Sequence, residues 1–334
     1  MYKHCYFIKV HVEECCMNFQ GLAQIGNADW FIDLSFRQAK KRGDELRGQV
    51  KGTRLEKSKK IEMDKLVAIR NISTKHLKNI LLAFPSLDGM AEFYQELVKA
   101  TLDYEKLKKS LGALNWAIKR INDQTMQSTF KIKKTQDLNT INAIRREYYG
   151  RFASIIKQIN PALTYLETAR KTMRTYPSIK QNMFTVALAG FPNVGKTTLL
   201  TKLTPSSAQV ADYAFTTLGL NVGYLKRPDL KIQYIDTPGT LDRFEKMNAV
   251  EKQAYLAIKY CADVVVYVID VTEPYPLADQ LALMERLKGF HKEMIVYYSK
   301  ADVADEQVLE AQRAKLPGFT SAELLEEELI KRAK

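Results

Sequence analysis

Cysteine is scarce in this chain of 334 residues, and long apolar runs are missing. Three of the four cysteines precede residue 17. This distribution argues against a disulfide framework and predicts a reducing, cytoplasmic compartment. The apolar runs are short, such as residues 264–269 between Asp263 and Asp270, whereas a membrane span needs roughly 18 residues. We therefore expect no membrane partner.

The first 21 residues lack the pattern of a secretion signal, because Lys9 and His11 interrupt the apolar run at 7–12 and two glutamates follow it. Cysteines and histidines are crowded here, but adjacent cysteines suit tetrahedral metal binding poorly and the spacing matches no zinc pattern. We expect a loosely ordered leader over residues 1–21 rather than a metal site, with Met17 as an alternative start. The residues weighed for metal binding are His4, Cys5, His11, Cys15 and Cys16.

Charge divides the sequence into two parts. The formal net charge is +13, which on charge alone indicates a polyanionic partner, either nucleic acid or an anionic membrane surface, and the expected absence of a membrane partner favours nucleic acid. Residues 1–180 hold 33 Lys and Arg against 18 Asp and Glu, a net of +15, while residues 181–334 have a net of −2. With 46% hydrophobic residues the chain has enough apolar side chains for folded cores. We expect one basic domain, residues 22–178, and one near-neutral domain, residues 179–334.

The basic half predicts a bundle of antiparallel helices, from apolar residues at steps of three or four. Gly43 is expected to end the first helix and to open a polar linker to Arg54, and 131–134 is expected to be a basic hinge. Asn160 and Pro161 are expected to cap and begin the last helix. The predicted helices cover 27–42, 55–83, 88–102, with Asp88 as its cap, 103–125, 137–159 and 160–174.

Lysine and arginine clusters recur along these helices. Any one cluster fits a solvated helix face, but the net charge of the whole domain favours contact with RNA, since phosphate contacts need only cations placed along a surface. The clusters are Lys57, Lys59 and Lys60; Lys106, Lys108 and Lys109; Lys131, Lys133 and Lys134; and Arg145 and Arg146.

The second half alternates predicted strands and helices, which is the pattern of a doubly wound α/β fold with a mostly parallel sheet. Ligands in such folds bind beyond the carboxyl ends of the strands. Strands are predicted over 183–189, 218–226, 231–236, 263–269 and 293–298. Helices are predicted over 196–204, 247–261, 276–288, 303–315 and from 321.

A phosphate-binding loop follows the first of these strands. Residues 190–197 fit the pattern G-x-x-x-x-G-K-[ST], in which backbone N–H groups surround the β-phosphate and Lys196 reaches the β- and γ-phosphate oxygens. The hydroxyl of Thr197 is a candidate Mg²⁺ ligand. The residues expected to contact the nucleotide here are Phe191, Pro192, Asn193, Val194, Gly195, Lys196, Thr197 and Thr198.

A second motif, Asp236-Thr237-Pro238-Gly239, follows another predicted strand some 40 residues later. Asp236 is expected to hold Mg²⁺ through water, and the Gly239 N–H to bond a γ-phosphate. Between the two motifs lie Phe215, Thr216 and Thr217. We favour Thr217 over Thr216 as the residue that completes the Mg²⁺ shell while the γ-phosphate is present. Lys196, Thr217, Asp236 and Gly239 are thus the candidate catalytic residues.

The base-binding residues are expected after the fifth strand. The Asp302 carboxylate can accept from guanine N1–H and N2–H₂, donors that adenine lacks in that place, so GTP is favoured over ATP. Lys300 is expected to pack its stem along the base. Ser299 stands where an Asn is usual, which is expected to weaken affinity more than selectivity. Ser321 and Ala322 are expected near guanine O6.

These motifs together resemble a family. GFPNVGKTT, YAFTT, DTPG, SKAD and TSA, in this order, are similar to the Obg-related branch of translation-factor-class GTPases. The basic half resembles the helical domain of the nucleolar GTP-binding protein family through FPSLD at 84–88, FYxxL at 93–97, DYEKL at 103–107, LG at 111–112, YLExAR at 165–170 and PSI at 177–179. The resemblance covers about residues 22–325. The end of the chain at residue 334 resembles the short, archaeal form.

The resemblance implies a GTPase that acts on the precursor of the large ribosomal subunit, as a monomer, through contacts with rRNA and ribosomal proteins. It also implies that Asn193 is a candidate ligand for K⁺ near the phosphates. Thr240 follows Gly239 where Ras-type enzymes have a water-orienting Gln, so slow intrinsic hydrolysis is expected. Two alternatives stay open: an rRNA-binding scaffold that GTP stabilises and that scarcely turns over, and another translation-linked GTPase of the same branch.

Overall fold

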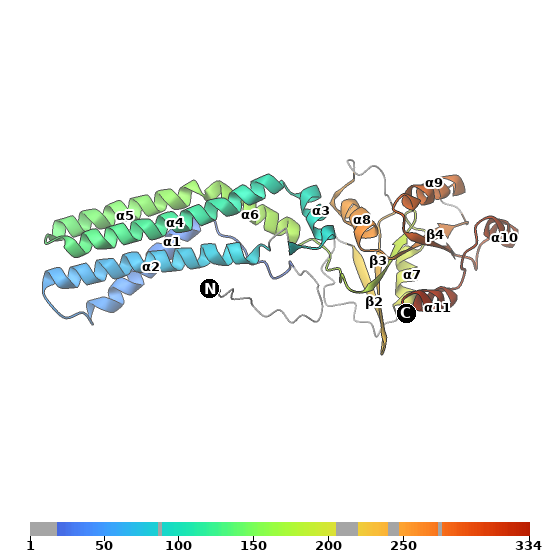
Figure 1. Cartoon of the computed structure of the whole chain (residues 1–334), viewed down its shortest axis with the longest axis horizontal. Helices are drawn as coiled ribbons and strands as arrows, with labels where there is room; N and C mark the ends of the chain where they lie inside the picture. The colour runs from blue at the N-terminus through green and yellow to red at the C-terminus, as the bar shows by residue number, and fades with distance from the viewer. Residues whose placement is uncertain (1–18, 86–88, 205–219, 240–246, 273–275) are drawn as a thin grey trace, which may run out of the picture. The chain divides into compact units, whose positions relative to one another are not determined.

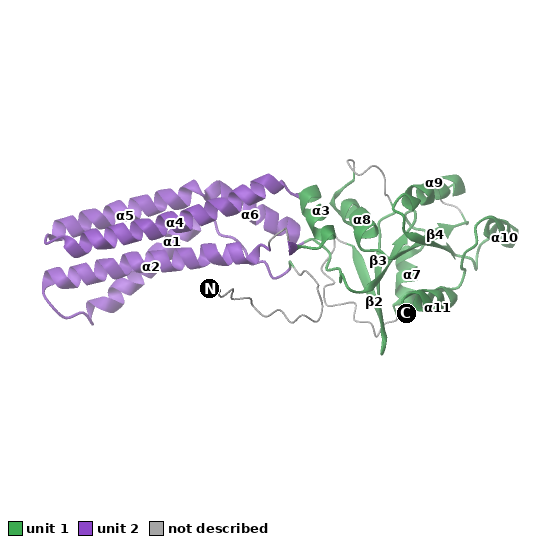
Figure 2. Cartoon of the chain, viewed as in Figure 1, with its two compact units in different colours: residues 1–19, 90–101, 175–334 green, residues 20–89, 102–174 purple. Residues whose placement is uncertain are grey.

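The computed structural model describes residues 19–85, 89–204, 220–239, 247–272 and 276–334. The chain forms two compact units (Figure 2). Residues 20–89 and 102–174 make up the helical unit, and residues 1–19, 90–101 and 175–334 make up the sheet unit. Residues 1–18 of the expected leader and the cap expected at Asp88 lie outside the described residues.

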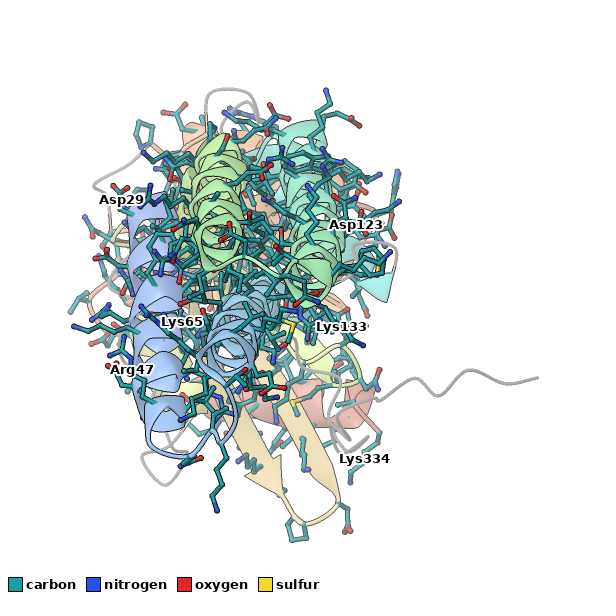
Figure 3. The ribbon with its side chains drawn as sticks, turned by 90° about the vertical axis from the view of Figure 1, so that its left-hand side faces the viewer. Asp29, Arg47, Lys65, Asp123, Lys133 and Lys334 are labelled. Atoms are coloured by element: carbon teal, nitrogen blue, oxygen red, sulfur yellow. The ribbon has the colours of Figure 1, made fainter. Side chains whose placement is uncertain are left out.

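The helical unit is built from five helices, which Figure 1 labels. They are α1 (Ala28–Arg47), α2 (Arg54–Ala83), α4 (Tyr104–Lys134), α5 (Leu138–Gln158) and α6 (Asn160–Met173). Polar side chains accept backbone N–H groups at four of the N-termini, with a capping box between Thr53 and Glu56 at the start of α2. Buried apolar side chains such as Leu66, Ile121 and Phe152 fill the interior. Figure 3 shows α1, α2, α4 and α5 side by side when viewed along the bundle.

Three local predictions in this unit are wrong. Gly43 lies buried inside α1, where its missing Cβ makes room for a neighbour: a Cβ there would stand 2.3 Å from Lys65 Cε. Residues 131–134 are the last turn of α4 and not a hinge, and their positive charges complement the helix C-terminus. Asn160 does not cap its own helix; its Oδ1 accepts the Ala28 N–H of α1 at 2.9 Å.

The sheet unit contains a five-stranded sheet in the order β2-β3-β1-β4-β5. Strands β1 (Phe184–Ala189), β3 (Leu230–Asp236), β4 (Val264–Asp270) and β5 (Glu293–Ser299) are parallel, and β2 (Asn221–Arg227) is antiparallel to β3. The predicted mostly parallel, doubly wound sheet is confirmed. Its helices are α3 (Glu92–Thr101), α7 (Lys196–Leu203), α8 (Ala249–Tyr260), α9 (Leu277–Lys288), α10 (Glu306–Lys315) and α11 (Ala322–Arg332).

Both faces of the sheet are covered. Helices α7 and α11 pack on one face through a core that includes Leu199 and Leu325. Tyr267 of β4 donates to the Gln280 carbonyl of α9, and every residue of β4 is buried. Parallel strands between two layers of helices are buried on both faces, and their sequences are therefore continuous apolar runs.

Helix α3 packs against α8 and therefore belongs to the sheet unit, although it precedes the predicted domain boundary after residue 178. The boundaries 22–178 and 179–334 stay a prediction. In the part of the chain that the structure describes, no helix has both the length and the hydropathy that crossing a membrane requires.

Candidate nucleotide-binding site

The predicted phosphate loop connects β1 to α7 at the carboxyl edge of the sheet. Gly195 immediately precedes α7 with a φ of 95°, a conformation that glycine adopts without strain, and Asn193 has a φ of 61°. Val194 is buried in the core and anchors the loop. Phe191 and Pro192 are half-buried, while Asn193, Thr197 and Thr198 are exposed. The loop thus presents its backbone at a helix N-terminus, which favours anions.

Lys196 is the first residue of α7, and its ammonium is enclosed by the loop. Nζ donates to the carbonyls of Gly190 at 3.0 Å and Phe191 at 2.6 Å, and the residue is only 6% exposed. Burial lowers the pKa of Lys196 to about 8, against the opposing effect of Asp236. A lysine held this way is a desolvated cation, and approaching phosphate oxygens would compete with two carbonyls for it.

Thr197 and Asp236 come together at the ends of β1 and β3. Thr197 Oγ1 donates to Asp236 Oδ2 at 2.6 Å, and Asn221 Nδ2 donates to the same oxygen at 3.4 Å. Asp236 Oδ1 is buried and has no partner among the residues that the structure describes. A hydroxyl beside a carboxylate with a spare oxygen is a hard-oxygen donor set that fits Mg²⁺.

The turn that follows Asp236 lies directly against the phosphate loop. Thr237 is fixed by two hydrogen bonds, since its N–H and its Oγ1 both donate to the Leu188 carbonyl, at 3.2 and 2.7 Å. Gly239 approaches the loop so closely that a Cβ would stand 2.0 Å from Pro192 N. Pro238, like Gly239, is half-buried. The two motifs predicted to bind phosphate are therefore in direct contact and form one site.

The expected base-binding residues follow β5. Ser299 is buried and its Oγ donates to the Ile269 carbonyl at 3.2 Å; a Cβ on Gly195 would lie 3.6 Å from Ser299 Cβ. Ser299 thus lies beside the phosphate loop but bonds to β4. Lys300 has a φ of 53° and pairs with Asp270, Nζ to Oδ2 at 2.5 Å, and Asp302 is exposed.

Backbone hydrogen bonds between Phe319 and β5, an edge strand of the sheet, place Ser321 and Ala322 beside that strand. Phe319 N–H donates to the Val296 carbonyl at 2.9 Å, and the Phe319 carbonyl accepts from Tyr298 N–H at 2.7 Å. Ser321 then caps α11 by accepting the Leu324 N–H at 3.3 Å. Phe215, Thr216, Thr217 and Thr240 lie outside the described residues, so their roles stay predictions.

Asp270, which no motif of the sequence singled out, contacts the expected base-binding residue Lys300. It ends β4 with a fully buried side chain, its Oδ1 accepts from Thr272, and both its backbone N–H and its carbonyl are bonded by the Gln280 amide. Hydrogen bonds from Lys300 and Thr272 lower the pKa of Asp270 although its burial, the largest single effect, opposes this. The signal was present, because Asp270 follows an apolar strand as Asp236 does.

Known proteins match both units. Residues 19–180 match the NOG1 N-terminal helical domain, and residues 185–300 match the family described as 50S ribosome-binding GTPase. Protein MJ1408 of Methanocaldococcus jannaschii is 33% identical over 293 residues, which is 86% of this chain and 82% of that protein. Nucleolar GTP-binding protein 1 of Drosophila melanogaster is 30% identical over 89% of this chain.

The chain belongs to the nucleolar GTP-binding protein family.

Membership in the nucleolar GTP-binding protein family identifies the sheet unit as a P-loop GTPase domain and the chain as a GTP-binding protein. The chain spans 46% of the fly relative and 38% of the Candida glabrata relative, which is 34% identical. Among solved structures, the G domain of the T. maritima FeoB iron transporter is 30% identical, with a TM-score of 0.37, over 46% of this chain and all of that chain.

Proposed function

We propose that the chain is a GTP-hydrolysing switch in the assembly of the large ribosomal subunit, and that its helical unit contacts rRNA. The observation that supports this most is the joining of a strongly basic helical domain to a GTPase domain in one chain. The names of the matched families, a 50S ribosome-binding GTPase and a nucleolar GTP-binding protein, point to the same process.

GTP binding would begin with the phosphate loop. The loop amides and the N-terminus of α7 attract the phosphates, and Lys196 exchanges the Gly190 and Phe191 carbonyls for β- and γ-phosphate oxygens. Thr197 and Asp236 would hold Mg²⁺, Asp236 through water, and the ion neutralises charge that develops on the phosphates. The spare Oδ1 of Asp236 gives that carboxylate a free acceptor for this task.

The position of the turn at Gly239 would depend on whether the γ-phosphate is bound. Its N–H is the proposed donor to the γ-phosphate, and its contact with Pro192 passes any displacement to the loop. Thr217 is proposed to join the Mg²⁺ shell only in the GTP state. Slow intrinsic turnover and K⁺ binding at Asn193 stay predictions that rest on Thr240 and Asn193.

Guanine recognition is proposed at Asp302, which is exposed and free to accept from guanine N1–H and N2–H₂. In this proposal Lys300 packs along the base, and its ion pair with Asp270 holds the side chain in place. Backbone at Ser321 and Ala322 completes the site. Ser299 bonds to Ile269 and contributes little to the base itself.

The test of this function is crosslinking of the protein to RNA in cells, with the crosslinked sites mapped by sequencing. We expect hits on large-subunit rRNA, made by peptides of the helical unit. Hits confined to tRNA would instead support a translation-linked GTPase. An Asp236→Asn variant separates a switch from a scaffold: if it leaves precursor particles at the normal rate, hydrolysis does not time release.

A further inference from the structure

The helical unit has a basic pocket that the proposed GTP site does not use. The pocket is an open hollow of about 320 Å³ between α1, α2 and α5. This volume is at the lower end of the range for small-molecule sites, large enough for one nucleotide and too small for a duplex. In the bundle's end-on view the labelled Arg47 and Lys65 lie on the α1 side, away from Lys133 on α4 (Figure 3).

Five cationic side chains line this basic pocket against a single lining carboxylate, that of Asp44. Arg47 pairs with Asp44 at 2.9 Å, and Lys65 and Arg145 share Glu62 Oε1 at 2.8 and 3.4 Å. The two remaining lining cations, Lys40 and Arg146, are exposed and make no hydrogen bond or ion pair within the described part of the chain. These two are available to an incoming anion.

An aromatic pair also lines the basic pocket. The rings of Phe36 and Tyr149 stack with their centroids 4.8 Å apart and their planes 20° from parallel. Both residues are half-buried, so part of each ring stays accessible. Flat aromatic and guanidinium surfaces beside phosphate-binding cations are how proteins hold unpaired nucleotides, because every base has a face that can stack.

Gly43 explains how Lys65 enters the pocket. It lies in α1 between the turns of Lys40 and Arg47, and a Cβ there would stand 2.3 Å from Lys65 Cε and 3.4 Å from Nζ. The Lys65 side chain, only 11% exposed, therefore passes beneath α1 through the space that glycine leaves. An alanine would push only the flexible end of that lysine aside, so the helix itself would tolerate it.

We propose that this basic pocket binds a single nucleotide of an unpaired RNA strand, with its phosphate on Lys40 and Arg146 and its base against the aromatic pair. The proposal rests on the proposed rRNA contact of the helical unit and assigns that contact a place. Pairing of Lys65 and Arg145 with Glu62 holds them at the base of the pocket, where they add positive potential.

Binding of the full chain to a fluorescein-labelled, single-stranded RNA oligonucleotide of mixed sequence tests the pocket, measured over a range of salt. Lys40→Gln with Arg146→Gln should weaken binding about tenfold at physiological salt and make the salt slope shallower by about 0.7, the value for the one phosphate contact that is lost. The matched control is Lys119→Gln with Arg120→Gln on α4, which removes the same two charge types from exposed positions without partners among the described residues. Equal losses in the two variants overturn the proposal.

A second pair of variants separates the pocket from net charge. Gly43→Ala should weaken RNA binding while the charge stays the same, whereas Gly150→Ala, in α5 with open space at its Cβ position, should not. Unchanged binding by Gly43→Ala contradicts the role of Lys65. Unlabelled AMP serves as a competitor: displacement at concentrations as low as those of the RNA would make this a free-nucleotide site and overturn the strand assignment.

The unaltered chain separates the two proposals. If it binds no RNA, both the pocket and the proposed rRNA contact fail. If it binds RNA and the pocket variants match their controls, the pocket alone fails.

Discussion

The two units use polar residues in opposite ways. The helical unit has 29 Lys and Arg against 14 Asp and Glu, a net of +15, and the sheet unit has a net of −2. Many buried polar groups of the helices bond within a turn, as Ser73 Oγ does to the Ile69 carbonyl. In the sheet unit they join distant segments, as Thr197 does with Asp236. The proposed nucleotide site is therefore concentrated at one sheet edge, whereas the proposed RNA contact depends on charges distributed over the helical unit. Single substitutions should matter most at the nucleotide site.

The largest effect is expected from Lys196→Ala, because this lysine is the only buried cation that the structure places in the phosphate loop. Loss of a charge aimed at the phosphates should lower kcat/KM for GTP hydrolysis by at least about a hundredfold. Single-turnover hydrolysis measures this. Lys202→Ala, an exposed position on the same helix α7, is the control. Comparable rates for the two variants would show that the site is elsewhere.

Gly239→Ala is expected to come next. A methyl group would stand 2.0 Å from Pro192 N, so the turn must move away from the phosphate loop. We expect GTP hydrolysis to fall about tenfold or more through the displaced N–H. Gly112→Ala in α4, where a Cβ meets open space, controls for the added side chain. Normal hydrolysis in the Gly239 variant would remove that N–H from the mechanism.

The pH dependence of GTP affinity tests the role of Lys196 in the sheet unit. Lys196 loses its proton near pH 8 in the nucleotide-free chain, and bound phosphates favour the charged form. Affinity should be full below pH 8 and fall by up to about tenfold per pH unit above it, with proton uptake on binding. Calorimetry in buffers of different protonation enthalpy measures the uptake. Lys196→Arg, which does not titrate there, should flatten the profile; an identical profile in both proteins would contradict this assignment.

A smaller and cumulative effect is expected in the helical unit. Neutralising Lys106, Lys108 and Lys109 to Gln should weaken binding to precursor particles and make its salt slope shallower by up to about 2.7, at about 0.9 per contact. GTP affinity should not change, because these lysines belong to the other unit. Sedimentation with purified particles at several salt concentrations tests it. A changed GTP affinity would contradict the proposal that particle binding and GTP binding belong to separate units.

The smallest effect concerns the monovalent cation. If Asn193 helps to hold K⁺ near the phosphates, single-turnover hydrolysis with large-subunit particles present should be faster in K⁺ than in Na⁺, as added positive charge stabilises the transition state. Asn193→Asp would be a poor test because it changes charge, so Asn193→Ser is the better variant. Equal rates in the two salts would leave Asn193 as a brace of the loop.

Much of the sheet unit could be predicted because its signals are local. An apolar strand followed by Gly-rich or acidic residues places Lys196, Thr197 and Asp236 at one edge, and the structure brings Thr197 and Asp236 within 2.6 Å. Parallel strands end together, so their motifs meet without any knowledge of packing. The Lys300 contact with Asp270 was not predicted, since which side chain faces a lysine depends on the neighbouring strand.

Two of the three errors in the helical unit have a shared cause. Gly43 and Asn160 carry the local signals of a helix stop and a helix cap, yet each serves a different helix: Gly43 admits Lys65 of α2, and Asn160 caps α1. Such roles arise from tertiary contacts, which no window of sequence contains. The basic pocket shares this origin, because its walls come from three helices.

The position of α3 has a consequence for how this protein can be divided. Phe93, Tyr94, Leu97 and Val98 are each at most 1% exposed, and the Tyr94 hydroxyl donates to the Pro177 carbonyl and accepts the Ile179 N–H. A fragment cut after residue 174 would lose the residues that cover these side chains and both of these hydrogen bonds, and it should aggregate. The chain passes between its units at 19/20, 89/90, 101/102 and 174/175, so protein engineers who want the helical part alone must replace α3 with a short polar loop.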